Sequence, residues 1–221
     1  MPALYEACAT SVAQARAAQR AGADRLELCA RIGTGGLTPP IARVAATRAA
    51  VKIPIHVMIR PRPGNFVYTT GEIAEMRRCI AAVRKVGADG VVLGALTPGG
   101  GIDTDALAHL LESADGLSVT FHRAFDEVTD PLVGLEHLVA LGVDRILTSG
   151  GAPTARSGTP MLRKLVIAAR GRIEIIACGT VRAANAKRLM AAAGVTEIHA
   201  HLQSPGDMRA LALVIHAEPR W

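Results

Sequence analysis

One short pattern occurs four times in this chain, each time where a helical stretch gives way to an apolar run. In every copy a glycine is followed by a small apolar residue, then by a polar one, and then by a strand-like apolar run. Glycine takes the left-handed conformation that ends a helix, and the apolar run has the length of a buried strand. The copies lie at residues 21–28, 86–93, 141–147 and 193–199. They predict four equivalent junctions between a helix and a strand.

The intervals between the copies leave room for one further strand and helix each. Those strands are predicted at residues 4–8, 55–60, 118–122 and 172–177, which makes eight strands in all. Alternation of strand and helix requires a parallel sheet, and eight units favour closure over an open doubly wound sheet. For a chain of 221 residues the expected fold is therefore α/β, with one domain over 1–221. That domain is a single (βα)8 TIM-type barrel of parallel strands.

Proline and capping residues predict where several helices begin. Thr69 and Glu72 have the spacing of a capping box, ahead of an apolar face at helical spacing. The last helix is expected to be short, over about residues 207–216. The other predicted starts are Thr38-Pro39, Asp130-Pro131 and Thr159-Pro160.

Charge and aromatic content argue against a polymeric partner. The formal net charge is +6, but the arginines are dispersed, and aromatic residues make up only 3% of the chain. We therefore expect no nucleic acid partner, and no apolar run is long enough to suggest a membrane segment. No G-x-G-x-x-G follows the first strand and no P-loop motif occurs, so no nucleotide cofactor is expected. A small ligand is the expected partner.

The cysteines bear on the compartment. Cys8, Cys29, Cys79 and Cys178 are widely scattered, and the first residues do not resemble a signal peptide. We expect reduced thiols rather than a disulfide framework, and hence a cytoplasmic protein.

Strand periodicity predicts which side chains face the barrel axis, because alternate residues point to opposite faces. In residues 55–60 the branched apolar side chains form the outer face, so His56, Met58 and Arg60 point inward. Barrel cores are ordinarily apolar, so a convergence of ionisable groups predicts a functional site. The same alternation turns further residues inward: Glu6, Cys8, Glu27, Cys29, Thr120, His122, Glu174, Cys178, Glu197 and His199.

One interpretation of this convergence is a catalytic site. Glu27 and His122 are the expected proton-exchanging groups, and Asp126 could orient His122. Further catalytic candidates are Glu6, His56 and His199.

The alternative is a structural plug of ion pairs in which Arg60 neutralises Glu27 or Glu6. Glu174 and Glu197 come early in their strands, so we expect them in the lower layers with a stabilising role.

Three arginines near predicted strand ends could hold an anion. Arg60 and Arg62 belong to a loop stiffened by two prolines, and Arg123 follows His122. Guanidinium groups bind carboxylates and phosphates through paired hydrogen bonds, so these arginines are predicted to bind substrate. A rigid turn with solvated guanidinium groups is the alternative. The glycine loops at residues 33–36, 148–151 and 178–181 offer free backbone N–H groups, but glycine is also routine in turns.

Cys8, Cys29 and Met58 are predicted near the ends of three consecutive strands. These soft donors suit Cu(I), whereas histidine and carboxylate donors would suit zinc or a harder divalent ion. The sequence has no C-x-x-C or H-E-x-x-H spacing, and inward cysteines can also simply fill space.

Five stretches in order resemble the CutC copper homeostasis family: AGADRLELC at 21–29, GGLTP at 35–39, HVMIRPR at 56–62, TFHRAFD at 120–126 and RILTSG at 145–150. The resemblance runs from about Glu6 to His199 and implies a cytoplasmic TIM-type barrel, an association with copper and homo-oligomers. By motif it carries over Glu6, Cys8, Glu27, Cys29, Met58, Arg60, His122, Arg123 and His199. The chain departs from the family pattern at Asn65, at Cys79 and in the turn at 177–180, so no shared role is expected at Asn65 or Cys79.

Two functions follow. The resemblance implies a protein that binds or handles copper, with Cu(I) held by Cys8, Cys29 and a third donor, either Met58 or a histidine at the barrel mouth. The inward acids, bases and arginines instead predict a barrel enzyme of unknown reaction, acting by acid/base chemistry on a small anionic or sugar-like metabolite. Whether the chain is an enzyme stays open from sequence.

Overall fold

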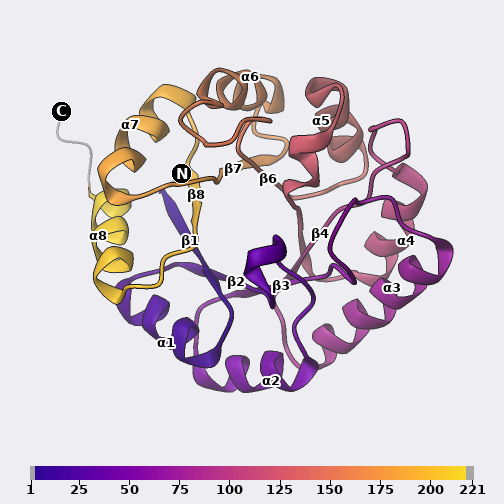
Figure 1. Ribbon diagram of the computed structural model, residues 1–221, viewed down its shortest axis with the longest axis horizontal. Helices are drawn as coiled ribbons and strands as arrows, with labels where there is room; N and C mark the ends of the chain where they lie inside the picture. Colours follow the sequence, from indigo (N-terminus) through magenta and orange to yellow (C-terminus); the bar gives the residue numbers. More distant parts are fainter. Residues whose placement is uncertain (1–2, 218–221) are drawn as a thin grey trace.

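Eight parallel strands pair in chain order, and the last strand pairs with the first, so the sheet closes into a barrel. The computed structural model describes residues 3–217. In Figure 1 the strands form the inner ring and the helices surround it. The predicted (βα)8 barrel is confirmed, and residues 1, 2 and 218–221 of the predicted domain lie outside the described residues. Among residues 3–217 no helix is long and apolar enough to cross a membrane.

The strands are β1 (Leu4–Ala9), β2 (Arg25–Leu28), β3 (Ile55–Met58), β4 (Gly90–Leu93), β5 (Ser118–Phe121), β6 (Arg145–Thr148), β7 (Glu174–Ala177) and β8 (Glu197–Ala200). The helices are α1 (Val12–Ala21), α2 (Ile41–Ala50), α3 (Thr70–Lys85), α4 (Thr104–Ser113), α5 (Pro131–Ala140), α6 (Thr159–Ala169), α7 (Ala183–Ala193) and α8 (Pro205–His216). Two 3-10 turns, η1 (Ile32–Thr34) and η2 (Arg123–Glu127), follow β2 and β5.

Each copy of the repeated pattern ends a helix as predicted, because all four of its glycines have positive φ. The polar residue does more than turn the chain. In three copies it is an aspartate. Its carboxylate accepts a backbone N–H from the first or second residue of the preceding strand. The bonds are Tyr5 N to Asp24 at 2.7 Å, Ile55 N to Asp89 at 2.8 Å and Val119 N to Asp144 at 2.7 Å. Each aspartate therefore ties two neighbouring strands together at the N-terminal end of the barrel.

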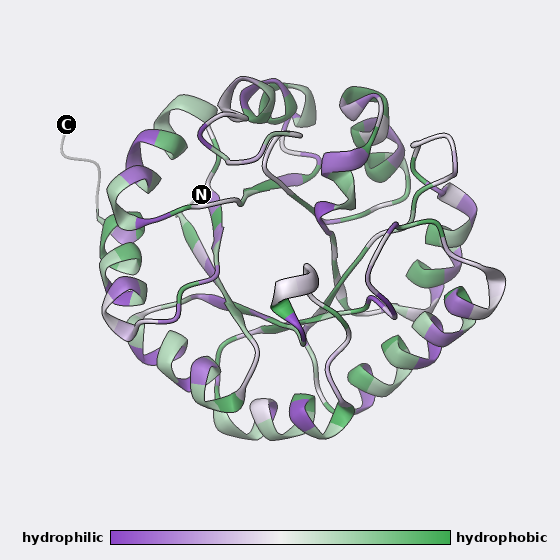
Figure 2. Cartoon of the chain, in the orientation of Figure 1, coloured by the Kyte–Doolittle hydropathy of each residue, from purple (hydrophilic) through white to green (hydrophobic). Residues whose placement is uncertain are grey.

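The helices turn apolar side chains toward the barrel, such as Ile73, Met76 and Ile80 of α3, and Figure 2 shows green and purple residues alternating along the helices. The predicted capping box of Thr69 and Glu72 is present, and Asp130 caps α5 as expected. The predicted helix start at Thr38 is wrong, because α2 begins only at Ile41. The Thr38 hydroxyl instead accepts the backbone N–H of Arg60 at 2.8 Å.

The expectation of a short last helix is also wrong. The helix α8 has 12 residues, whereas α1, α2, α4 and α5 have 10 each. It begins earlier than predicted because Ser204 accepts the backbone N–H of Asp207 and Pro205 occupies the first turn.

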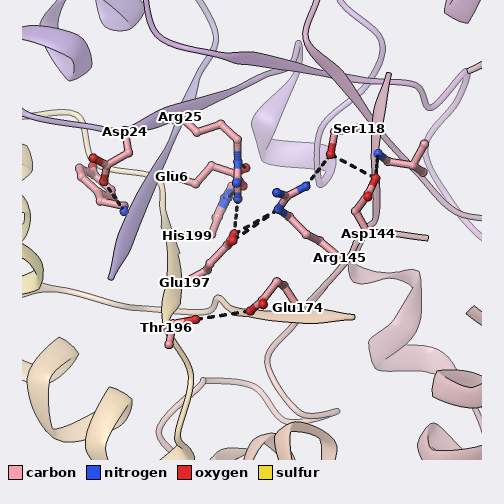
Figure 3. A network of polar contacts seen from close by, with 12 residues as sticks. Glu6, Asp24, Arg25, Ser118, Asp144, Arg145, Glu174, Thr196, Glu197 and His199 are labelled. Carbon is pink, nitrogen blue, oxygen red and sulfur yellow. Dashed lines mark hydrogen bonds and ion pairs between the residues drawn. The ribbon is translucent and has the colours of Figure 1, made fainter. Parts of the chain in front are cut away.

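The part of the barrel interior near the N-terminal ends of the strands, called the lower interior below, contains a network of buried charges (Figure 3). Arg25 contacts Glu6 and Glu197 at 2.5 Å each, and Arg145 reaches Glu197 at 3.4 Å. The predicted plug of ion pairs therefore exists, and Glu197 belongs to it. The predicted partner Arg60 is wrong, because the inward residue that neutralises Glu6 is Arg25, at the start of β2.

We expect Asp144→Ala to lower the free energy of unfolding by about 1–3 kcal/mol, because it leaves the N–H of Val119 without its acceptor. Asp144→Asn retains a side-chain carbonyl oxygen and should recover most of that loss. Urea unfolding checks both, with exposed Glu75→Ala as the control. Equal stability of Asp144→Ala and the control would contradict the role given to the repeated aspartate.

Candidate functional site

A cavity of about 310 Å³ opens at the C-terminal end of the strands. Its floor is the upper barrel interior, and Ile32 of η1 forms part of its wall. In Figure 1 this short turn, coloured as the residues just after β2, lies over the ring of strands. Six of the predicted site residues line the cavity: Glu27, Met58, Arg60, His122, Arg123 and His199.

The other candidates lie elsewhere. Glu6 and His56 are buried in the barrel interior below the cavity, and burial lowers the pKa of His56 to about 4. Gly90 makes room for this ring, since a Cβ there would lie 2.6 Å from its Cδ2 atom. Arg62 does not reach the cavity, because its guanidinium contacts Glu72 and the Val67 carbonyl. In this structure Arg62 fixes its own loop, and its predicted role in binding substrate stays a prediction.

Arg60 lines the cavity, yet its guanidinium is largely occupied. It donates to the carbonyl oxygens of Thr34 at 2.8 Å, Gly36 at 3.2 Å and Gly64 at 2.9 Å, and it stacks on Phe66 at 4.7 Å. Only Nε is buried without a partner. Arg60 thus joins the loops after β2 and β3, and two of its five N–H groups, one on Nε and one on Nη2, are left without a carbonyl acceptor.

Asp126 does not orient His122 as predicted. Its carboxylate accepts from Arg123 Nε at 2.8 Å, from the Thr148 hydroxyl at 2.5 Å and from the Ser149 N–H at 2.9 Å. This aspartate therefore organises the loop after β6 and fixes Arg123 at the edge of the cavity.

His122 lines the cavity and has one ring nitrogen without a hydrogen-bond partner. Its Nδ1 accepts the Ala124 N–H at 3.2 Å, so in the neutral ring Nε2 carries the hydrogen, and Nε2 is buried without a partner. Burial and the charge of Arg60 lower the pKa of His122 to about 3. Gly94 allows this placement, because a Cβ there would lie 2.6 Å from Nδ1. The residue is a neutral hydrogen-bond donor that a bound ligand would satisfy.

Glu27 also has a polar atom without a hydrogen-bond partner. The residue is 3% exposed and its Oε2 has no hydrogen-bond partner. Burial raises the pKa of Glu27, the charge of His199 opposes this rise, and the charge of Glu6 adds to it. A buried acid with a raised pKa is typical of groups that exchange protons in catalysis.

His199 is held between two carboxylates. Its Nδ1 lies 2.8 Å from Glu6 Oε1, and the other Glu6 oxygen is held by Arg25. Burial by itself would lower the pKa of His199, but the charge of Glu27 and the bond to Glu6 raise it. Burial would raise the pKa of Glu6, but the charge of Arg25 and the bond from His199 bring it well below its usual range. Glu6 therefore stays ionised and orients the His199 ring.

Two of the thiols are neighbours. Cys8 Sγ lies 3.6 Å from Cys29 Sγ, and both pack with Met58 and Val92 in a buried cluster. The bond to Cys29, burial and the charge of Glu27 all raise the pKa of the Cys8 thiol. All three predicted soft donors thus lie in one group, and Met58 is the member of that group that lines the cavity.

The remaining cysteines lie apart from this pair. Cys178 packs with Leu147 and Ile176 in a separate interior cluster, and Cys79 is half-buried on α3.

Sequence reasoning missed two side chains at the cavity edge, Arg182 and His201. They follow β7 and β8 in loops without regular periodicity, so strand parity says nothing about their direction. The only available signal was their position just after predicted strands, where barrel enzymes carry site residues.

We expect His122→Asn to make stability less dependent on acid. The folded-state pKa of about 3 lies below the unfolded value of about 6.5, so the unfolded chain takes up the proton first. The contribution of His122 is complete above pH 6.5 and is lost as pH falls toward 3, at up to about 1.4 kcal/mol per pH unit.

Urea unfolding between pH 7.5 and 4.5 should give a shallower slope for His122→Asn than for the wild type. His109→Asn, at a side chain that is 60% exposed, is the control. An unchanged slope in His122→Asn would mean that the ring does not stay neutral in the folded protein.

Comparison with known proteins places the chain in a family. The model of the CutC family matches residues 3–204. A Porphyromonas gingivalis relative named family protein CutC is 47% identical over 206 residues, covering 92% of this chain and 83% of the relative. A Homo sapiens relative named copper homeostasis protein cutC homolog is 43% identical, covering 92% and 75%.

A solved structure agrees with these matches. The crystal structure of a CutC protein of Streptococcus agalactiae superposes with a TM-score of 0.86 at 35% identity, covering 89% of this chain and 97% of the other. The resemblance noted in the sequence is confirmed, and the chain belongs to the CutC copper homeostasis family.

Proposed function

We propose that this protein binds Cu(I) through Cys8 and Cys29, with Met58 as a further sulfur donor, and so takes part in handling copper. The observation that carries the proposal is the distance of 3.6 Å between the two Sγ atoms in a cluster that also contains Met58. Thiolate and thioether sulfur are the donors that select Cu(I) among the biological metals. The name of the human relative, which refers to copper homeostasis, lends support at the level of the family.

The chemistry of the donor set fits this ion. Both thiols are buried, at 1% and 0% exposed, and thiols must lose their protons before they bind a metal. Copper uptake should therefore release protons. The proposal includes a cytoplasmic location, since a reducing compartment keeps both thiols free. Self-association remains a prediction from the family resemblance.

Anaerobic titration with Cu(I) against a chromophoric chelator tests the proposal. The wild type should bind one ion per chain, and Cys8→Ser and Cys29→Ser should each lower the affinity by about 100-fold or more, since even outer-shell changes cost 10–100-fold. Met58→Leu should lower it less. Cys79→Ser, at the half-buried thiol on α3, is the matched control. Equal affinity in the wild type and both cysteine variants would contradict the proposal.

A second candidate function is an enzyme that acts by acid/base chemistry on a small anionic or sugar-like metabolite. It is favoured by three buried polar atoms without partners, Glu27 Oε2, Arg60 Nε and His122 Nε2, belonging to residues that line one cavity. In this function Glu27 exchanges a proton with the substrate and His122 donates a hydrogen bond to it. Arg123 and Arg182 at the cavity edge favour a negatively charged group.

A thermal-shift screen of phosphorylated and carboxylated metabolites tests this second candidate. A ligand present at about 100 times its Kd stabilises the folded state by about 2.7 kcal/mol, which is a shift of several degrees for a domain of this size. The shift should disappear in Glu27→Gln and persist in Glu127→Gln, at an exposed residue of η2. Shifts that are the same in both variants would argue against a site at Glu27.

A further inference from the structure

Three side chains of different chemistry converge from three neighbouring strands. Cys8 on β1, Glu27 on β2 and His199 on β8 each place one donor atom within 4.8 Å of the other two. The strand register explains the convergence, because Cys8 pairs with Glu27 and Glu6 pairs with His199 on inward-facing positions. Thiolate, carboxylate and imidazole are the three ligand types that zinc binds in proteins.

His199 already has the surroundings of a metal ligand. In metal sites the second ring nitrogen of a ligating histidine usually bonds a carboxylate, which fixes the tautomer and the ring orientation. Here Nδ1 bonds Glu6 Oε1 at 2.8 Å, and Arg25 holds the other Glu6 oxygen at 2.5 Å. Within residues 3–217 no group bonds the Nε2 atom of His199, which leaves that nitrogen available for a ligand.

Glu27 shares the charge of His199 with Glu6 and has no arginine or lysine partner of its own among residues 3–217. Its Oε2 is buried without a hydrogen-bond partner, and no arginine or lysine of the described chain forms a salt bridge with it. Arg25, the nearest buried cation of the network, is engaged by Glu6 and Glu197. An uncompensated buried carboxylate is costly, and a bound cation would remove that cost.

The three donors leave an open side. Glu27 and His199 both line the cavity, whereas Cys8 lies behind them in the buried cluster. Three protein ligands with one position open to a cavity are typical of catalytic zinc sites, while structural sites are closed by four. In zinc sites each donor atom lies about 2.0–2.3 Å from the ion. Side-chain rotations that move the three donor atoms by on the order of 1 Å would bring them to that distance from a common point.

We propose that Cys8, Glu27 and His199 bind a divalent cation of the zinc type, with Glu6 as the positioning residue of His199 and one coordination position facing the cavity. This site is distinct from the Cu(I) site of Cys8, Cys29 and Met58, with which it shares only Cys8. The borderline donor set prefers a divalent ion, while the sulfur set prefers Cu(I). The two sites exclude each other at Cys8, so one chain holds one ion or the other.

The test uses the reduced, metal-free full chain. Titration with Zn²⁺ alone, followed by calorimetry, should give one tight site per chain. Glu27→Gln and His199→Asn should each weaken it by about 100-fold or more, and Glu6→Gln by about 10–100-fold, as expected for an outer-shell partner. Glu127→Gln and His109→Asn, at exposed positions, are the matched controls and should bind like the wild type.

Co²⁺ gives a readout in the wild type itself, and one variant then identifies the sulfur ligand. If Cys8 is a ligand, the Co²⁺-loaded wild type should show a charge-transfer band from sulfur to cobalt, and Cys8→Ser should lose that band. The inference is overturned if the wild type binds Zn²⁺ no better than Glu27→Gln and His199→Asn. A Co²⁺ spectrum without the sulfur band overturns it as well.

Each of the two metal proposals can be contradicted without contradicting the other. Cys29→Ser should abolish tight Cu(I) binding while leaving Zn²⁺ binding in place, and Glu27→Gln should do the reverse. A chain that binds Cu(I) but not Zn²⁺ overturns this inference alone. A chain that binds Zn²⁺ through Glu27 but shows no dependence of Cu(I) binding on Cys29 overturns the proposed function alone.

Discussion

Arg25 is the buried charge on which the arrangement of this barrel depends. A barrel of this fold usually fills its interior with branched apolar side chains, yet here Glu6 is completely buried and Glu197 nearly so. Arg25 contacts both at 2.5 Å, and Arg145 adds a weaker contact to Glu197. Removing one partner of such a network leaves an uncompensated charge in a medium of low polarity, which costs several kcal/mol. The charged side chains of the lower interior therefore stabilise the barrel only when all of them are present.

The same network orients the groups above it. With Glu6 held as a carboxylate by Arg25, its second oxygen fixes the ring of His199 and turns the opposite nitrogen away from Glu6. One ring nitrogen of His199 lies within 4.8 Å of a Glu27 oxygen and of the Cys8 thiol. The ion pairs at the bottom of the barrel and the polar side chains at its mouth thus form one continuous series of contacts. The upper layer contains polar atoms without partners, which a folded protein tolerates where a ligand completes them.

The fold and the inward direction of several site residues could be predicted from sequence, because successive side chains of a strand point to opposite faces. Parity correctly turned Glu6, Glu27 and His122 inward, and the repeated glycine pattern gave the barrel. Parity could not assign partners, which depend on stagger between strands: Arg25 rather than Arg60 neutralises Glu6. Strand parity gives no information about the direction of side chains in loops. The directions of Arg62 and Asp126 are set by local hydrogen bonds with no sequence period, and both were expected to serve the site.

The most direct test of this account is the protonation of the His199 ring, observed by NMR in protein with ¹⁵N-labelled histidine. The account predicts a hydrogen on Nδ1, strongly shifted by its bond to the Glu6 carboxylate, and loss of that shift in Glu6→Gln. An Nδ1 without hydrogen in the wild type, or a signal that Glu6→Gln leaves unchanged, would contradict the claim that Arg25 and Glu6 orient the site.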